Sequence, residues 1–385
     1  MHICYLCNEY PPAKHGGIGS FVQTLGREFV RRGHAVTVLG VYPQPGPSEE
    51  TDEGVRVLRL PEGAVPAVRL LLRRRALNSK LRSLHRENPI DVIEGSERSF
   101  FLIERSLAIP KIVRMHGGYC YLSVMLGQKP GRWLSFVERT SFATADSVAA
   151  VSRFVGETTR GLVGLGTRPI RVILNPVDLN IFRPPDPPCE QEDHLVCVGT
   201  VIERKGVRQL LEAMPKILEA RPRARLTFYG NDSRYPDTGE SYTRFLERNL
   251  PEALRPHVSF AGPVPRLRLP EVMAPASVCL YPSHIESLPI AWLEGMAMGK
   301  AVVASDVGPG PEVVEHEVSG LLCNPRDPDA IAQAVIRLLQ DAELRRRLGA
   351  AARLRTEKLF ALDKLIDENL GYYRECAAAF QGRLP

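Results

Sequence analysis

The sequence of 385 residues contains no run of about 18 uncharged apolar residues, so no membrane-spanning helix is expected. A basic leader is also missing. The first apolar run, HICYLC, is followed at once by Asn8 and Glu9, which predicts a first β-strand and not a signal peptide. The eight cysteines are scattered, and Cys4 and Cys7 have no second pair at zinc-ligand spacing. These absences favour a protein of the reducing cytoplasm whose two N-terminal thiols are buried.

Charge of one sign is concentrated in the first half of the chain. The net charge is +6, and residues 1–185 contain 25 lysines and arginines against 16 acidic residues. Such a surplus indicates an anionic partner, which can be a membrane surface, a phosphorylated acceptor or nucleic acid. No RNP, zinc-finger or helix-turn-helix signature is present, so nucleic acid is not expected.

Residues 66–88 carry part of this charge in a helical pattern, with arginines at 69, 73 and 75 largely off the apolar face. One interpretation is a surface helix whose leucines join the core. The other is a helix that docks reversibly on anionic lipid at the inner membrane face. The predicted apolar face consists of Leu70, Leu77, Leu81 and Leu84.

Short apolar runs alternate with longer amphipathic runs in both halves, which predicts βαβ units and parallel sheets covered by helices. Between the halves, residues 183–193 are rich in proline and acid and have no periodicity, as a linker would. We therefore expect doubly wound α/β domains at residues 1–183 and 184–360 and a terminal helix at 361–385. Because ligands bind beyond the carboxyl ends of such strands, a cleft between two facing sheets is the expected site.

Two turns join a strand to a helix in a way that suits phosphate. In EYPPAKHGGIGSF, Gly16 and Gly17 let the backbone approach a ligand at a helix N-terminus, although the spacing is not that of a dinucleotide fingerprint. In VGTVIERKG, Arg204 and Lys205 stand at a helix entrance, where two cations can bind a diphosphate. An ordinary tight turn and a solvated basic turn are the respective alternatives.

Three further residues are candidates for chemistry. RMHGGYCYL places His116 at the exit of a strand before two glycines, where a functional and a structural role are both open. In PSHIESLPIAWLEGMAMG, Glu286 lies in a loop after a strand and Glu294 lies two turns inside the next helix. Ser287 is expected to cap this helix, and Pro289 is tolerated in its first turn.

The E-x7-E stretch, together with NPVD, ADSVAAVS, the ERKG turn and SGLLCNPRDPDAIAQAV, resembles the retaining glycosyltransferases of the GT-B fold, family 4 (glycosyl transferases group 1). The resemblance covers nearly the whole chain. It implies an acceptor-side N-terminal domain, a C-terminal domain that binds a nucleotide sugar, both Rossmann-like, and a terminal helix that crosses back. It also implies hexose transfer with retained anomeric configuration and no metal; no D-x-D motif is present at the end of a predicted strand. UDP- and GDP-sugars are expected ahead of ADP-sugars, and the acceptor can be a glycan, a lipid-linked molecule or a small molecule.

The resemblance assigns a role to each matching position, with the base bound mainly through backbone groups. His116 and Glu286 would contact the transferred sugar, Gly16, Gly17, Arg204 and Lys205 the diphosphate, Glu294 the ribose, Ser287 and Leu288 the donor sugar, and Pro263 and Val264 the base.

Two positions depart from the family pattern. Thr200 stands where an arginine is usual, so Arg204 would have to supply that charge, and Pro289 removes an amide that a glycine would offer. Thr200 leaves a catalytically degenerate subunit that binds nucleotide sugars as one alternative to a transferase. A non-hydrolysing sugar-nucleotide epimerase is the other, because it can share the GT-B architecture.

Overall fold

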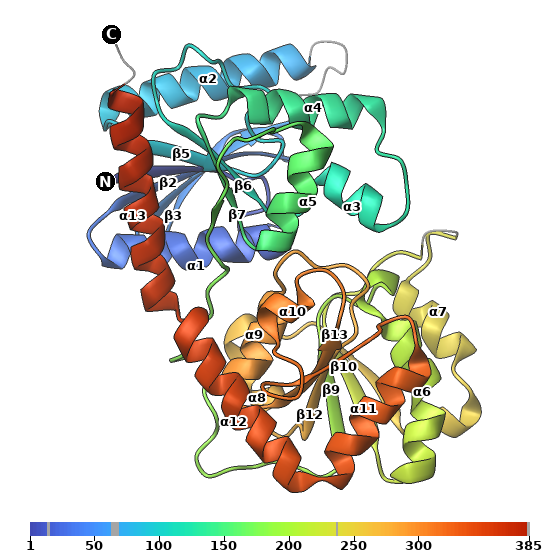
Figure 1. The fold of residues 1–385 in the computed structure, drawn as a ribbon. Helices are drawn as coiled ribbons and strands as arrows, with labels where there is room; N and C mark the ends of the chain where they lie inside the picture. The colour runs from blue at the N-terminus through green and yellow to red at the C-terminus, as the bar shows by residue number, and fades with distance from the viewer. Residues whose placement is uncertain (14–15, 63–68, 236–237, 383–385) are drawn as a thin grey trace. The chain divides into compact units, whose positions relative to one another are not determined.

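The computed structural model describes residues 1–13, 16–62, 69–235 and 238–382 (Figure 1). The chain divides into two compact units, a first unit of Met1–Asn175 with Asp363–Pro385 and a second unit of Pro176–Leu362. Each unit contains its own mainly parallel sheet flanked by helices, which confirms the predicted α/β class. The boundaries predicted after residues 183 and 360 both lie within the second unit of this division.

The first unit contains an eight-stranded sheet in the order β3-β4-β2-β1-β5-β6-β7-β8. All neighbours are parallel except β3, which pairs antiparallel with β4 at the edge. The sequence did not predict β3, because its residues SEETD are polar and exposed and show no alternation. The strands are His2–Leu6 (β1), Ala35–Tyr42 (β2), Ser48–Asp52 (β3), Val55–Pro61 (β4), Val92–Gly95 (β5), Lys111–Met115 (β6), Ser147–Ala150 (β7) and Arg171–Val172 (β8).

The first helix, α1, buries the face that its periodicity predicts. In the first helix Phe21, Val22, Leu25 and Phe29 are buried, and the helix ends before Gly33, whose φ of 81° suits glycine. The thiols of Cys4 and Cys7 are buried, as predicted, and burial raises the pKa of each to about 12. The helices are Gly17–Arg31 (α1), Arg69–Glu87 (α2), Tyr119–Met125 (α3), Arg132–Thr144 (α4), Arg153–Val163 (α5) and Leu362–Gln381 (α13).

Helix α2 corrects one prediction. Leu77, Leu81 and Leu84 are buried, but Leu70 is 46% exposed and does not share their environment. Periodicity fixes the direction in which a side chain points, but burial also needs a packing partner opposite it. Residues 66–68 of the predicted helix lie outside the described residues.

The terminal helix α13 belongs to the first unit through a buried polar network. Arg114 donates two hydrogen bonds of 2.8 Å to the carboxylate of Glu94 and one of 2.6 Å to Asn369 of α13. Tyr373 of α13 donates to the same carboxylate at 2.9 Å. All four side chains are buried, so the ion pair and its hydrogen bonds to Asn369 and Tyr373 fix α13 on the sheet.

Removing the Tyr373 hydroxyl should therefore lower the free energy of unfolding by more than a conservative substitution usually does. Tyr373→Phe loses a bond to a charged acceptor, and we expect the free energy of unfolding to fall by about 1.5–3 kcal/mol. Tyr372→Phe is the matched control, because its hydroxyl donates to the neutral Val148 carbonyl at 3.1 Å, and we expect this hydroxyl to contribute about 0.5–1.5 kcal/mol. Urea unfolding compares them, and equal losses would contradict the role given to Glu94.

The second unit contains a six-stranded parallel sheet in the order β11-β10-β9-β12-β13-β14. Its strands are His194–Val198 (β9), Arg225–Tyr229 (β10), Val258–Gly262 (β11), Val278–Tyr281 (β12), Ala301–Ser305 (β13) and Leu321–Cys323 (β14). The main helices are Val207–Ala220 (α6), Tyr242–Asn249 (α7), Leu269–Met273 (α8), Ile290–Ala297 (α9), Gly310–Val313 (α10), Pro328–Gln340 (α11) and Ala342–Leu359 (α12).

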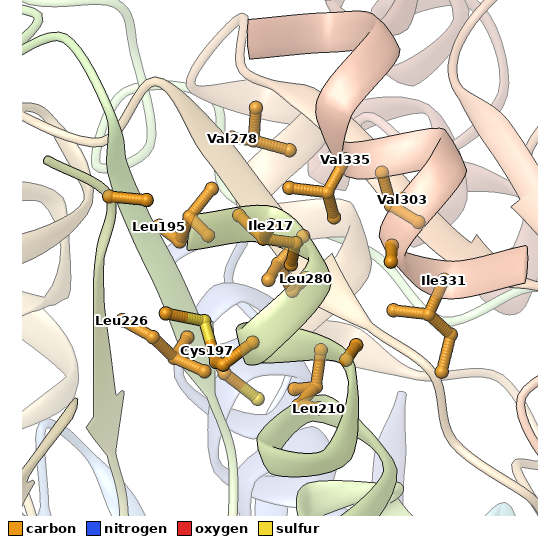
Figure 2. Packing of buried hydrophobic residues seen from close by; sticks show 14 of the residues in the cluster. Leu195, Cys197, Leu210, Ile217, Leu226, Val278, Leu280, Val303, Ile331 and Val335 are labelled. Atoms are coloured by element: carbon orange, nitrogen blue, oxygen red, sulfur yellow. The ribbon is translucent and has the colours of Figure 1, made fainter. Parts of the chain in front are cut away.

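The core of the second unit lies between this sheet and two helices on one of its faces. Figure 2 shows Leu210 and Ile217 of α6 and Ile331 and Val335 of α11 packed against the strand residue Leu280 and its neighbours. All of these side chains are fully buried. This core fixes the strand ends from which the candidate site projects. Among the described helices, none is both long enough and apolar enough to cross a membrane.

Candidate active site

The strand order of the second unit reverses between β9 and β12. Strands β9, β10 and β11 follow one another toward one edge, and β12, β13 and β14 toward the other. In open α/β sheets such a switch point, at the carboxyl ends of the strands, is where ligands bind. Lys205 comes shortly after β9 and Glu286 shortly after β12, so the chain places both candidates at this point.

The loops after β9 and β12 touch through their backbones. Gly206 has a φ of 72°, and a Cβ built there would lie 2.0 Å from the carbonyl oxygen of Pro282. The amide of His284 donates to the carbonyl oxygen of Arg204 at 2.8 Å. Glycine is therefore required at position 206 so that the loops after β9 and β12 can approach each other closely. Across these two loops, the Lys205 ammonium donates a hydrogen bond to the Glu286 carboxylate. The structure thus pairs a residue assigned to the diphosphate with one assigned to the sugar.

A pocket lies beside this ion pair, within the second unit. Its walls include Gly199, Thr200, Lys205, Ser283 and Trp292. Thr200, the residue that departs from the family pattern, thus lines the same pocket as Lys205. Arg204 lies on the short 3-10 turn Glu203–Lys205, and its guanidinium forms no hydrogen bond or ion pair with any residue that the structure describes.

Helix α9 begins later than predicted. Its N-cap is Pro289, in an extended conformation (φ −78°, ψ 110°), so Ser287 is not the N-cap residue that the sequence predicted. Leu288 is buried, and Ser287 and Glu286 are half-buried. Glu294 projects from the second turn of α9 and is only 4% exposed.

Glu294 has a partner that sequence reasoning missed. Arg266 Nε donates to Glu294 Oε1 at 3.1 Å. Burial raises the pKa of Glu294, and Arg266 opposes that shift. Arg266 stands on the 3-10 turn Arg266–Arg268, directly after the predicted base-binding residues, of which Pro263 is exposed and Val264 half-buried. This ion pair therefore links Glu294, the ribose candidate, to the segment that contains the base candidates Pro263 and Val264. No sequence motif predicts the pair.

In the first unit the strand order reverses between β1 and β5, and Gly16 lies after β1 as the N-cap of α1. The carboxylate of Glu9 accepts hydrogen bonds from the amides of Gly16 (3.3 Å) and Gly19 (2.9 Å). Gly17 is exposed. The sequence predicted a diphosphate at Gly16 and Gly17 and gave no sign of Glu9. In the structure, the amides of Gly16 and Gly19 donate to this carboxylate of the chain itself, as they could to the oxygen of another anion.

His116 follows β6, and its ring packs edge-on against Phe21 of α1 with centroids 4.9 Å apart. Burial, and then the charge of Arg114, lower the pKa of His116 to about 3. The imidazole is therefore neutral at physiological pH, so it can donate or accept a hydrogen bond but cannot supply a positive charge.

Two buried acids hold the loop that carries His116, and sequence reasoning missed both. Glu97 accepts the amide of His116 at 2.6 Å, and Glu138 accepts the amide of Cys120 at 3.0 Å and that of Tyr119. A Cβ at Gly118 would lie 2.5 Å from Glu138 Oε1 and 2.8 Å from Glu97 Cγ, which explains why glycine stands there. Burial raises the pKa of Glu97 to about 7.

Glu97 gives the stability a distinctive pH dependence. Between pH 4.5, the ordinary carboxyl value, and about 7, the folded protein binds more protons at Glu97 than the unfolded chain does. Glu97 therefore makes stability fall as pH rises through this window, by up to about 1.4 kcal/mol per pH unit. His116 acts in the opposite sense between pH 3 and 6.5, because the unfolded chain is the one that takes up the proton.

The variant Glu97→Gln removes only the first of these two effects. We expect its free energy of unfolding, minus that of the wild type, to increase from pH 4.5 to 7 and to stay constant above pH 8. Urea unfolding across this range measures the difference. His116→Gln is the control: its free energy of unfolding, minus that of the wild type, should decrease as pH rises toward 6.5. A difference that does not vary with pH would contradict the buried carboxyl at Glu97.

Two family models match this chain, glycosyltransferase family 4 over residues 15–181 and glycosyl transferases group 1 over residues 181–355. An uncharacterized glycosyltransferase of Methanocaldococcus jannaschii is 28% identical over 97% of this chain and 98% of its own length. A GDP-mannose-dependent α-(1-6)-phosphatidylinositol monomannoside mannosyltransferase of Mycobacterium tuberculosis is 28% identical over 91% of this chain and 92% of its own.

The solved structure of sucrose-phosphate synthase from Thermosynechococcus elongatus matches with a TM-score of 0.82, at 24% identity, over 98% of this chain and 99% of that one. The fold is therefore GT-B. The chain belongs to the group 1, family 4 glycosyltransferases, which use nucleotide-sugar donors.

Proposed function

We propose that this enzyme transfers a hexose from a UDP- or GDP-sugar to an acceptor, with retained anomeric configuration and without a metal. The observation that carries the proposal is the grouping of Lys205 and Glu286 beside one pocket at the switch point of the second sheet, with Glu294 on the following helix. A cation suits the diphosphate, and the two carboxylates suit hydroxyl groups of the sugar and the ribose.

The proposed reaction needs no carboxylate nucleophile. The bond between the anomeric carbon and the diphosphate oxygen breaks, and the acceptor oxygen bonds to that carbon from the same face. The acceptor proton passes to an oxygen of the departing diphosphate, whose charge Lys205 and Arg204 stabilise. Glu286 faces the positive charge that develops on the sugar. Ser287 and Leu288 line the sugar, and Pro263 and Val264 line the base. For the first unit, the family resemblance assigns His116 to the sugar and Gly16 and Gly17 to the diphosphate.

Incubation of the protein with UDP-, GDP- and ADP-hexoses without acceptor tests this proposal. Stabilisation against heat identifies the bound donor, since a ligand at 100 times its dissociation constant adds about 2.7 kcal/mol. Slow release of the nucleoside diphosphate supports the transferase. Tight binding without any release would instead support a degenerate subunit, and a change of configuration within the intact donor would support an epimerase.

We also propose that the first unit docks on an anionic membrane through α2 and a neighbouring aromatic group. Leu70, Leu71 and Leu72 are 46%, 66% and 48% exposed at the start of α2. Trp133 and Phe136 of α4 are exposed as well, and both rings pack against Phe101.

The loop that carries Phe101 also contacts α2, because the side chain of Asn78 in α2 donates a hydrogen bond of 2.8 Å to the Leu102 carbonyl. The two apolar groups therefore rest on one connected part of the first unit. Residues 69–139 contain 14 lysines and arginines but six acids. Three of the six acids and two of the cations are buried, so the remaining side chains of this range carry a surplus of positive charge. Cations around apolar and aromatic side chains suit an anionic bilayer surface.

Vesicle co-sedimentation checks this membrane contact. The protein should bind vesicles that contain phosphatidylglycerol, bind less at 0.5 M salt, and not bind pure phosphatidylcholine. Leu71→Glu should weaken the binding clearly. Leu354→Glu is the matched control, because Leu354 is equally exposed (65%) but lies on α12 of the second unit. Absence of binding to anionic vesicles at low salt, or equal losses in both variants, would contradict the proposal.

A further inference from the structure

The guanidinium of Arg266 is held in place from two sides. Its Nε donates to Glu294 Oε1 at 3.1 Å, and its Cζ lies 5.7 Å from the centre of the Phe182 ring. Phe182 is fully buried, and its carbonyl accepts a hydrogen bond of 2.7 Å from Arg353. The contacts fix the arginine before any ligand arrives, so little side-chain entropy remains to be lost on binding.

The ion pair leaves part of the Glu294 carboxylate available. A carboxylate has two oxygens that together accept about four hydrogen bonds. Arg266 uses Oε1, and within residues 1–13, 16–62, 69–235 and 238–382 the structure gives Oε2 no donor. Two neighbouring hydroxyl groups of a ribose are donors that fit such an acceptor.

The charge on Glu294 depends on Arg266. Burial on α9 raises the pKa of Glu294, and the Coulomb attraction and hydrogen bond of Arg266 lower it. Among the described residues, two further ionisable groups lie against these elements. Tyr281 of β12 is neutral because its pKa is raised, and Arg353 of α12 donates to the Ala297 carbonyl of α9. Without Arg266, the carboxyl would take up a proton at a higher pH and present a weaker acceptor.

We propose that Arg266 is a positioning residue for the donor ribose: it holds Glu294 ionised and oriented so that Glu294 accepts hydrogen bonds from the ribose hydroxyls. This inference rests on the proposed ribose contact of Glu294. It goes beyond that contact, because it assigns the affinity for the ribose to the Arg266–Glu294 ion pair and not to Glu294 alone.

The test compares nucleoside diphosphates with and without a ribose hydroxyl. Calorimetry at pH 6, 7.5 and 9 measures UDP and GDP, whichever binds, against the 2′-deoxy and 3′-deoxy forms. In the wild type, loss of a hydroxyl that bonds a charged acceptor should weaken binding about 10- to 150-fold at all three pH values. In Arg266→Met the penalty should be smaller than in the wild type, with the largest reduction at pH 6, where protonation of Glu294 is most favoured, and the smallest at pH 9.

Three further variants complete the design. Arg266→Lys keeps the charge and should restore most of the penalty at pH 6, whereas Arg266→Gln keeps a donor without charge and should not. Arg266→Gln also replaces Arg266→Met if that variant does not fold. Arg268→Met is the matched control, since Arg268 shares the 3-10 turn but is 67% exposed and pairs with Glu271, so binding should not change.

The outcomes separate the two levels of the proposal. If the wild type showed no deoxy penalty, the ribose contact of Glu294 would be wrong, and with it the role of Arg266. If the wild type showed the penalty and both neutral variants kept it at every pH, Glu294 would hold the ribose unaided and the role of Arg266 alone would be overturned. In turnover assays the expected signature is a raised donor KM with kcat unchanged.

Discussion

Glu286→Gln is expected to lower kcat about 100-fold or more while nucleoside diphosphate affinity stays equal or becomes tighter. The sugar gains positive charge as its bond to the diphosphate breaks, so a carboxylate beside it acts most strongly in the transition state. The free enzyme pairs Glu286 with Lys205, so the diphosphate has to share or break this pair. Glutamine keeps the shape and removes the competing charge, which is why binding should not suffer.

Glu294→Gln is the matched comparison, because it removes the other glutamate of the E-x7-E pair. Its proposed ribose contact is remote from the reacting carbon and similar in ground and transition states, so its loss should mainly raise the donor KM. Nucleoside diphosphate binding should weaken in this variant and not in Glu286→Gln. If both variants weakened that binding equally, the division of roles would be wrong. A loss of thermal stability without a kinetic difference would mean that the acid only supports local structure.

Lys205→Ala should weaken nucleoside diphosphate binding about 10- to 150-fold, because a charge-assisted contact is lost. The truncation also leaves Glu286 without this cation, so part of the effect appears as lower stability. The double variant Lys205→Ala with Glu286→Gln separates these terms: it should regain stability but not affinity.

Arg204→Ala serves as the neighbouring control for Lys205. If Arg204 replaces the arginine that Thr200 lacks, its loss should weaken binding comparably; if Arg204 is only solvated, binding should not change. Isothermal titration with the nucleoside diphosphate measures all of these variants. An unchanged affinity in Lys205→Ala would remove the diphosphate assignment.

The fold was predictable because its signals are local. The alternation of short apolar runs with amphipathic ones gives parallel sheets, and Gly33 and Gly299 mark helix ends through their left-handed backbone. The edge strand β3 was not predictable, because a polar strand forms only through pairing with its neighbour. The start of α9 was also missed: Ser287 looked like an N-cap in the sequence, but the chain stays extended as far as Pro289, which is the N-cap in the structure.

Those residues of the candidate site that belong to sequence motifs were predictable. The residues that only form hydrogen bonds or ion pairs with them were not. Lys205, Glu286 and Glu294 stand in recognisable stretches, but nothing in the sequence links Arg266 to Glu294 or Glu97 to the amide of His116. Such partners lie far apart in the sequence and meet only in the folded chain. The sequence does not single them out, because arginine and glutamate are common on any protein surface. Glu9 was missed for a different reason: it lies close to Gly16 in sequence, but a turn directs its carboxylate back to the helix amides.

The anomeric configuration of the first sugar released from the donor tests the central claim most directly. The protein is incubated without acceptor with the α-linked donor that binds, UDP-glucose or GDP-mannose, and proton NMR follows the product before mutarotation. Glu286→Gln is measured alongside to show that the release belongs to this site. The account predicts α-hexose as the first product and about 100-fold slower release in the variant. First appearance of the β-anomer, or release that does not depend on Glu286, would contradict it.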